Sequence, residues 1–173
     1  MHASFRWFLG ARPLLQFALL FVLIEALLVL FVPLIAPYDP LRQNIVARLK
    51  SPSAAFWLGT DQFGRDNLSR ILYGARTSLM VSGLAVGLAL VAGGTLGLMA
   101  AYYHGWLDRI VMRCMDILFA FPVLLLAIAI VAMLGPGSLS AAFAIAIVYT
   151  PIFARLLRGP ALVIVASDYV MNA

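Results

Sequence analysis

Four long apolar runs, separated by shorter polar segments, organise this chain of 173 residues. A helix needs about 20 apolar residues to cross the roughly 30 Å hydrocarbon core of a bilayer. The runs at about 14–35, 77–103, 117–134 and 139–157 meet or approach that length. Because backbone in lipid must satisfy its own hydrogen bonds, each run is expected to be a helix rather than an open strand. The pattern therefore predicts an all-α integral membrane protein with four helices.

Proline and glycine mark the expected breaks between these helices. The stretch from 117 to 154 carries no charge and is too long for one crossing, and the Gly-Pro-Gly-Ser sequence at 135–138 predicts a turn that divides it. The Gly-Pro pair at 159–160 is expected to end the fourth helix. Pro122 and Pro151 lie inside the third and fourth predicted spans, where each removes one backbone donor and can kink its helix.

Composition supports the membrane assignment and excludes several classes of function. The chain is 64% hydrophobic and only 11% charged, whereas soluble proteins carry about 25% charged residues. Its net charge of +5 comes from basic residues that flank the apolar runs, which favours anchoring at phospholipid headgroups over nucleic-acid binding. The single cysteine, Cys114, allows no intrachain disulfide. His2 and His104 lie far apart with no further ligand nearby, so no metal site is expected.

Motifs for catalysis are absent from the sequence. There is no phosphate-binding loop, no HExxH zinc motif, no GxSxG nucleophile motif and no dinucleotide-binding glycine pattern. We therefore expect no catalytic residue, no cofactor site and no enzymatic activity.

Two features inside the predicted spans are candidates for contacts. Glu25 lies near the middle of the first span, where a charge is costly, so it is expected to face protein or water. A helix–helix hydrogen bond and a substrate or ion contact are both open readings. In the second span, Gly83 and Gly87, then Gly93 and Gly97, have the four-residue spacing that lets helices approach closely. The partner helix could belong to this subunit or to a second membrane subunit.

Charge alone leaves the orientation nearly open. With four spans, the 12 Lys and Arg residues divide equally between the two sides of the membrane. Arg6 and Arg12 flank the first span and favour a cytoplasmic N-terminus. That span is longer than the roughly 7–15 apolar residues of a cleavable signal, so it is expected to be retained.

The polar segment before the second span is the most distinctive part of the chain. From 57 to 76 it reads Trp-Leu-Gly-Thr-Asp-Gln-Phe-Gly-Arg-Asp-Asn-Leu-Ser-Arg-Ile-Leu-Tyr-Gly-Ala-Arg. It resembles the segment that leads into the core of the C-type inner-membrane permease of dipeptide, oligopeptide and nickel ABC importers. Further similarity at 34–40, 105–109, 121–122, 134–136 and 154–159 extends the resemblance over nearly everything from 34 onward. The signature residues are Gly59, Thr60, Asp61, Gly64, Arg65, Asp66, Ser69, Arg70, Gly74, Ala75 and Arg76.

The resemblance implies a partial type I ABC importer membrane fold and a permease function. Residues 1–76 would form a membrane helix plus a periplasmic surface segment, and 77–173 part of an ABC transmembrane type-1 domain. The chain would serve an ATP-driven, binding-protein-dependent importer for peptides or similar small solutes. Implied partners are a second homologous permease, two cytoplasmic ATPases, a periplasmic substrate-binding protein and membrane lipid, with no nucleic acid. The implied location is the bacterial inner membrane, with a cytoplasmic N-terminus.

The chain departs from the family pattern at its C-terminal end. In this family a cytoplasmic loop after the fourth span carries Glu-Ala-Ala followed by a glycine, and this loop docks onto the ATPase. The corresponding partial segment here is Ser167, Asp168, Tyr169, Val170, Met171, Asn172 and Ala173. Met171 and Asn172 stand where Glu and Ala are usual, and two family helices are missing, so a truncated permease that is inactive alone is expected. The alternatives are a non-transporting membrane interaction protein or remnant, and an ion-coupled secondary transporter that uses Glu25.

Overall fold

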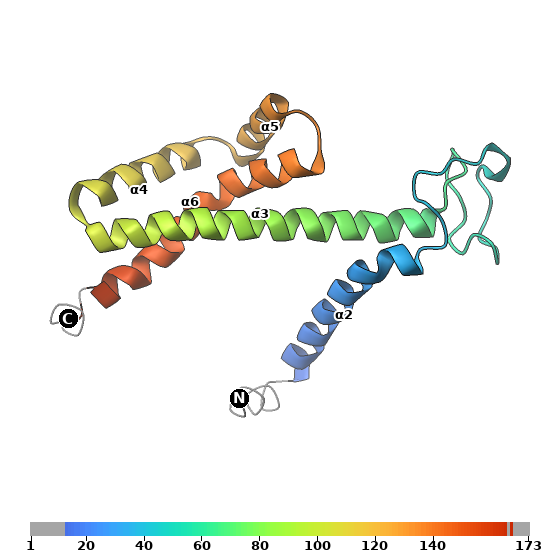
Figure 1. Cartoon of the computed structure of the whole chain (residues 1–173), viewed down its shortest axis with the longest axis horizontal. Coiled ribbons are helices and arrows are strands. Elements are labelled where there is room, and N and C mark those ends of the chain that lie inside the picture. Colours follow the sequence, from blue (N-terminus) through green and yellow to red (C-terminus); the bar gives the residue numbers. More distant parts are fainter. Residues whose placement is uncertain (1–12, 166, 168–173) are drawn as a thin grey trace. The chain divides into compact units, whose positions relative to one another are not determined.

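The computed structural model describes residues 13–165 and Ser167, and its regular elements in this part are helices (Figure 1). They are α2 (Pro13–Ile35), the short 3-10 helix η1 (Ile45–Ala47), α3 (Asn67–Tyr103), α4 (Gly105–Ala120), α5 (Val123–Leu134) and α6 (Ser138–Val165). Three of these helices are long and apolar enough to cross a membrane, and the number becomes four if the bent pair α4 and α5 forms one span. The predicted all-α membrane class is confirmed.

The chain divides into two compact units, Met1–Leu79 and Met80–Ala173. The first contains α2, the polar segment and the first turns of α3. The second contains the rest of α3 with α4, α5 and α6. In α2 only Val32 is buried, although the helix is almost entirely apolar. So much exposed hydrocarbon is compatible with lipid or with other protein around this helix, and not with water.

The helix predicted at 77–103 begins ten residues earlier, at Asn67. Asp66 caps it, because its carboxylate Oδ2 accepts a hydrogen bond from the backbone N–H of Ser69 at 2.8 Å. The predicted bounds of the span followed the uncharged stretch, whereas the Asp66 cap sets the beginning of the helix. The helix ends at Tyr103, where His104 and Gly105 both have positive φ, 51° and 64°.

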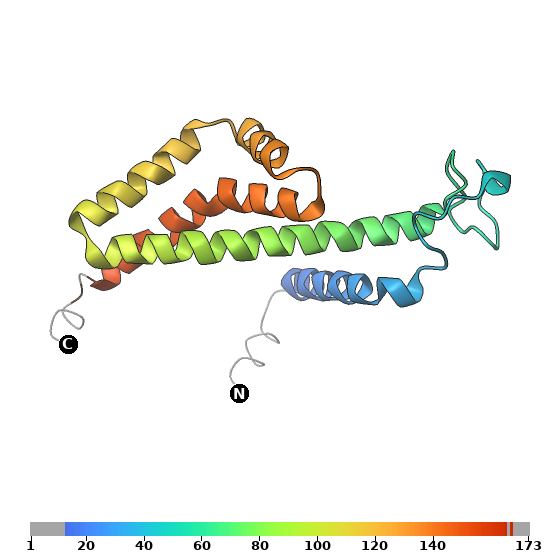
Figure 2. The ribbon, with the colours of Figure 1, turned by 45° about the horizontal axis from the view of Figure 1, so that its top comes forward.

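The predicted third span, 117–134, is wrong as a single helix. The structure has α4 and α5 in its place, bent by 95° at a short break (Figures 1 and 2). Phe121 is extended, with φ −83° and ψ 138°, because the ring of Pro122 disfavours helical backbone in the residue before it. The helix therefore breaks completely at Pro122 instead of kinking. The segment before the break, which contains the charged residues, is the separate helix α4.

The predicted end of the fourth helix at 157 is also wrong. α6 continues through the Gly-Pro pair at 159–160 to Val165 and contains both Pro151 and Pro160. Proline removes only one backbone donor, and in an apolar surrounding the remaining groups have no better partner than the helix itself. The break between α5 and α6 comprises residues 135–137, within the predicted turn, and Ser138 already begins α6.

Candidate functional site

Asp61 is the centre of the polar segment in the first unit. Its Oδ1 accepts hydrogen bonds from the backbone N–H groups of Phe63 and Arg65, at 2.8 and 3.0 Å. Its Oδ2 accepts from Arg65 Nε and Arg70 Nη1, both at 2.8 Å. Desolvation opposes ionisation, but the hydrogen bonds and charge of Arg65 outweigh it and lower the pKa of Asp61 from 3.8 to about 2. The ionised Asp61 carboxylate therefore holds the loop together through these four hydrogen bonds.

A second group of hydrogen bonds joins the end of α2 to the start of α3. Ser69 donates through its backbone N–H and its Oγ to Asp66 Oδ2, at 2.8 and 2.7 Å. The same Ser69 Oγ accepts from the backbone N–H of Tyr38 at 3.1 Å. Ser69 and Asp66 are buried, so this chain of bonds is shielded from competition with solvent. Tyr38 was not among the predicted site residues, because nothing local in the sequence shows a contact 31 positions away.

Two glycines allow the polar segment to fold back on itself. Gly64 has φ +72°, and a Cβ there would lie 1.8 Å from the carbonyl oxygen of Asn44; Gly59 has φ +66°, and a Cβ there would lie 2.5 Å from that of Lys50. Thr60 stabilises the same crossing, because its Oγ1 donates to the carbonyl of Ala47 and accepts from the N–H of Lys50. Both glycines are needed for the left-handed backbone and for the close approach.

The structure thus brings most of the sequence signature together as a scaffold. The residues that take part are Gly59, Thr60, Asp61, Gly64, Arg65, Asp66, Ser69 and Arg70. Gly74, Ala75 and Arg76 lie further along α3 and take no part in these bonds. Gly74 has no neighbour for a Cβ within 4 Å, and Arg76 Nε is buried without a hydrogen-bond partner among the described residues.

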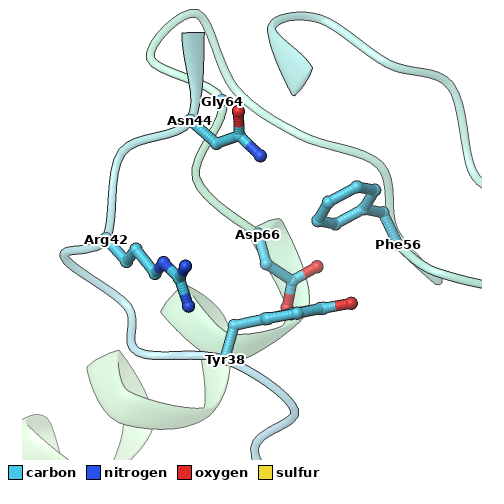
Figure 3. Close-up of a pocket in the computed structure, with 6 residues that line it drawn as sticks. All are labelled: Tyr38, Arg42, Asn44, Phe56, Gly64 and Asp66. Carbon is cyan, nitrogen blue, oxygen red and sulfur yellow. The ribbon is translucent and has the colours of Figure 1, made fainter. Parts of the chain in front are cut away.

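A small cleft of about 240 Å³ opens beside this scaffold (Figure 3). Its six lining residues are Tyr38, Arg42, Asn44, Phe56, Gly64 and Asp66. The rings of Tyr38 and Phe56 form one wall, with centroids 5.3 Å apart. The cleft is smaller than the roughly 300–1,000 Å³ of typical small-molecule sites. Across residues 13–165 and 167, no cluster of three potential metal ligands occurs.

Glu25 lines an apolar groove of about 290 Å³ within the first unit. One wall comes from α2, through Leu28, Val29 and Val32, and the other from the first turns of α3, through Leu72, Ala75, Ser78 and Leu79. Glu25 forms no ion pair with any residue that the structure describes. Its position next to another helix is compatible with both readings left open above.

The two glycine pairs of α3 have different surroundings. Gly93 and Gly97 are buried against α6: a Cβ would lie 2.3 Å from the carbonyl oxygen of Thr150 at the first position, and 2.2 Å from that of Ala154 at the second. Gly83 and Gly87 meet nothing within 4 Å in the described part of the chain. Gly93 and Gly97 therefore permit the backbones of α3 and α6 to approach closely. Gly83 and Gly87 have no such neighbour among the described residues.

Two ion pairs that were not predicted join α4 to the C-terminal half of α6. Arg158 donates from Nε and Nη2 to the two carboxylate oxygens of Asp108, at 2.6 and 2.7 Å. Arg155 donates to Asp116 at 2.7 Å. The sequence did not pair these four residues with one another. The sequence does show acidic residues before the third apolar run and basic residues at the end of the fourth. Partners 39 and 50 positions apart, however, cannot be matched from spacing alone.

Most of the predicted coupling segment lies outside the described residues. Of residues 167–173 only Ser167 is described; its N–H and Oγ donate to the carbonyl of Ile164, at 3.0 and 2.6 Å. The structure therefore provides no geometry for a coupling motif.

Comparison with known proteins places these features in a family. Residues 93–173 match the family described as "Binding-protein-dependent transport system inner membrane component". The chain is 49% identical over 147 residues to the dipeptide transport system permease protein DppC of Alkalihalophilus pseudofirmus, which covers 85% of this chain and 48% of that relative. It is 46% identical over 155 residues to the glutathione transport system permease protein GsiD of Pectobacterium atrosepticum, with 89% and 52% covered.

A third relative, the probable D,D-dipeptide transport system permease protein DdpC of Escherichia coli, is 40% identical over 171 residues, or 99% of this chain and 57% of its own length. The chain belongs to the peptide-type ABC importer permeases. It spans about half the length of the curated relatives it matches. As a member of this permease family with three to four apolar helices among its described residues, it is a multi-pass inner-membrane protein of the type I ABC importer fold.

Proposed function

We propose that this chain is part of the permease subunit of an ATP-driven, binding-protein-dependent importer for peptides or similar small solutes. The observation that carries the proposal is the similarity to permeases named for dipeptide, glutathione and D,D-dipeptide transport, at 40–49% identity across 85–99% of the chain. In this proposal the chain guides solute through the membrane, and ATP hydrolysis takes place on separate subunits.

The proposed topology has a cytoplasmic N-terminus. Residues 1–76 are proposed to form a membrane helix and a periplasmic surface segment, and residues 77–173 part of an ABC transmembrane type-1 domain. The hydrogen-bonded scaffold around Asp61 and Asp66 supports a defined outer segment, because it joins the end of α2 to the beginning of α3 over a short distance. Its proposed role is to hold these two helices in register at the outer surface.

The proposed partners are a second homologous permease, two cytoplasmic ATPases, a periplasmic substrate-binding protein and membrane lipid. Unfilled apolar surface supports further helices or lipid around the chain. A groove of about 440 Å³ lies between α5 and α6, and another of about 430 Å³ lies between the ends of α3 and α6. The open glycines Gly83 and Gly87 are proposed to face the second permease, since small residues permit close helix contact. Residues 167–173 are proposed to belong to the ATPase-coupling loop.

The test is transport in proteoliposomes that contain the chain with its second permease and ATPase subunits. Dipeptide uptake that requires both ATP and the binding protein is the expected result. Uptake that continues without ATPases and is lost in Glu25→Gln would support the ion-coupled alternative instead. Stable co-purification of the chain with a permease partner, without any uptake, would favour a non-transporting interaction protein.

A further inference from the structure

The charged residues of α4 fall into two groups. Asp108 and Asp116 are engaged with the two arginines of α6, as described above. Arg109 and Arg113 are exposed, and neither makes an ion pair or a side-chain hydrogen bond within residues 13–165 and 167. The contacts to α6 therefore leave two cationic groups of α4 unused.

The two unused arginines lie on one face of the helix. They are four positions apart, which puts their side chains one above the other on the same side. The buried residue of α4, Met115, lies on the opposite side. Arg109 and Arg113 are therefore exposed on the side of α4 that faces away from Met115.

Apolar and aromatic side chains surround the arginines on this outward face. Trp106 is 71% exposed, and Ile110 and Ile117 are exposed on the same face. Tyr102 and Tyr103, also exposed, end α3 immediately before α4. Aromatic side chains next to basic ones are typical of the boundary between hydrocarbon and lipid headgroups.

The chain also changes polarity at the break after α4. α5 carries no charged residue over its 12 residues, whereas all the charges of this region lie in α4. A change from charged to uncharged residues of this kind is expected where a bilayer passes from headgroups to hydrocarbon.

We propose that Arg109 and Arg113 bind the headgroup phosphates of anionic phospholipid. A guanidinium matches the geometry of phosphate oxygens and can form two parallel hydrogen bonds to them. The exposed Trp106 and the two isoleucines would contact the glycerol and upper acyl region of the same lipids, which a free phosphate ion cannot supply. Anionic lipid is therefore the occupant that satisfies both the charge and the apolar surface of this face.

The native cysteine makes this proposal testable at the site itself. Cys114 is the single cysteine of the chain and is exposed on α4, next to Arg113. The full chain, with a nitroxide on Cys114, is placed in nanodiscs of phosphatidylcholine alone or mixed with phosphatidylglycerol. Native mass spectrometry measures which lipid the protein retains. The depth of the nitroxide in the bilayer is measured by electron paramagnetic resonance, from its collisions with oxygen, which is enriched in hydrocarbon, and with a water-soluble nickel chelate.

The expected result is selective retention of phosphatidylglycerol and a probe at headgroup depth. R109Q/R113Q should lower the preference for phosphatidylglycerol by roughly 30-fold, or about 1 kcal/mol for each arginine. R109K/R113K should retain more of it than R109Q/R113Q, because the charge remains although the two parallel hydrogen bonds of each guanidinium are lost. R42Q, which removes an exposed arginine of the other unit, should leave the probe at Cys114 unchanged.

Three outcomes would overturn the proposal. An unchanged lipid preference in R109Q/R113Q would show that the arginines do not select lipid. A probe shielded from both oxygen and the nickel chelate would mean that protein covers this face. Displacement of the lipid preference by inorganic phosphate would identify a site for soluble anions.

Discussion

Replacing Gly97 by alanine tests the closest helix approach in the second unit. A Cβ at Gly97 would lie 2.2 Å from the carbonyl oxygen of Ala154, and 2.9 and 3.0 Å from its carbonyl carbon and Cα. All three neighbours are backbone atoms, so no side-chain rotation can make room. Non-bonded heavy atoms prefer separations of about 3.5–4.0 Å. The backbones of α3 and α6 must therefore separate by roughly 1 Å, and the surrounding contacts must loosen with them.

The size of the effect follows from a matched comparison with Gly87→Ala. Overpacking a well-packed contact typically costs about 1–3 kcal/mol. Alanine also favours helix over glycine by about 1 kcal/mol, but this gain is common to both variants and cancels in their difference. Gly87 has no neighbour within 4 Å among the described residues. We therefore expect Gly97→Ala to be less stable than Gly87→Ala by about 1–3 kcal/mol.

The assay is reversible unfolding of each variant in mixed micelles with increasing denaturing detergent, followed by circular dichroism. Gly93→Ala should behave like Gly97→Ala, since its Cβ would lie 2.3 Å from the carbonyl oxygen of Thr150. Equal stability of Gly97→Ala and Gly87→Ala would refute the close contact between α3 and α6. If Gly87→Ala is instead destabilised only when a second permease is present, the open glycine pair faces that subunit.

Three further predictions concern polar contacts and the intramembrane acid. The low pKa of Asp61 means that its contribution to stability is complete above pH 3.8 and is lost as the pH falls toward about 2; Asp61→Asn should remove this dependence from thermal unfolding midpoints between those values, and an unchanged pH profile would contradict it. Asp108→Asn should lower the stability of the fold by at most about 1 kcal/mol, because the ion pair with Arg158 is partly exposed. The loss should be visible as faster exchange of amide hydrogens in α4. Exchange in α4 at the wild-type rate would show that the pair does not hold the helix. Glu25→Gln should preserve ATP-dependent uptake in the assembled importer, whereas complete loss of uptake with intact assembly would assign a transport role to Glu25.

Some of these features could be predicted from particular residues. The membrane class follows from the uncharged runs, because no soluble fold can cover so much hydrocarbon. The folded polar segment between α2 and α3 could be anticipated in part, since Asp, Arg and Gly crowd the stretch from 59 to 70. The pairing of Asp61 with Arg65 and Arg70 is local and lies within reach of sequence reasoning. The contact from Tyr38 to Ser69 is not, because it depends on how α2 and α3 meet.

Hydropathy by itself determined that the chain belongs in a membrane and roughly where its apolar segments lie, since the cost of hydrating or burying a side chain depends mainly on the side chain. Only the tertiary structure decided where helices begin and break. It placed the start of α3 at the Asp66 cap, divided the third apolar run at Phe121, and continued α6 past Pro160. It also decided which of two identical glycine spacings is packed. Caps, breaks and helix contacts depend on which backbone groups meet in space, and that information is distributed over residues far apart in the chain.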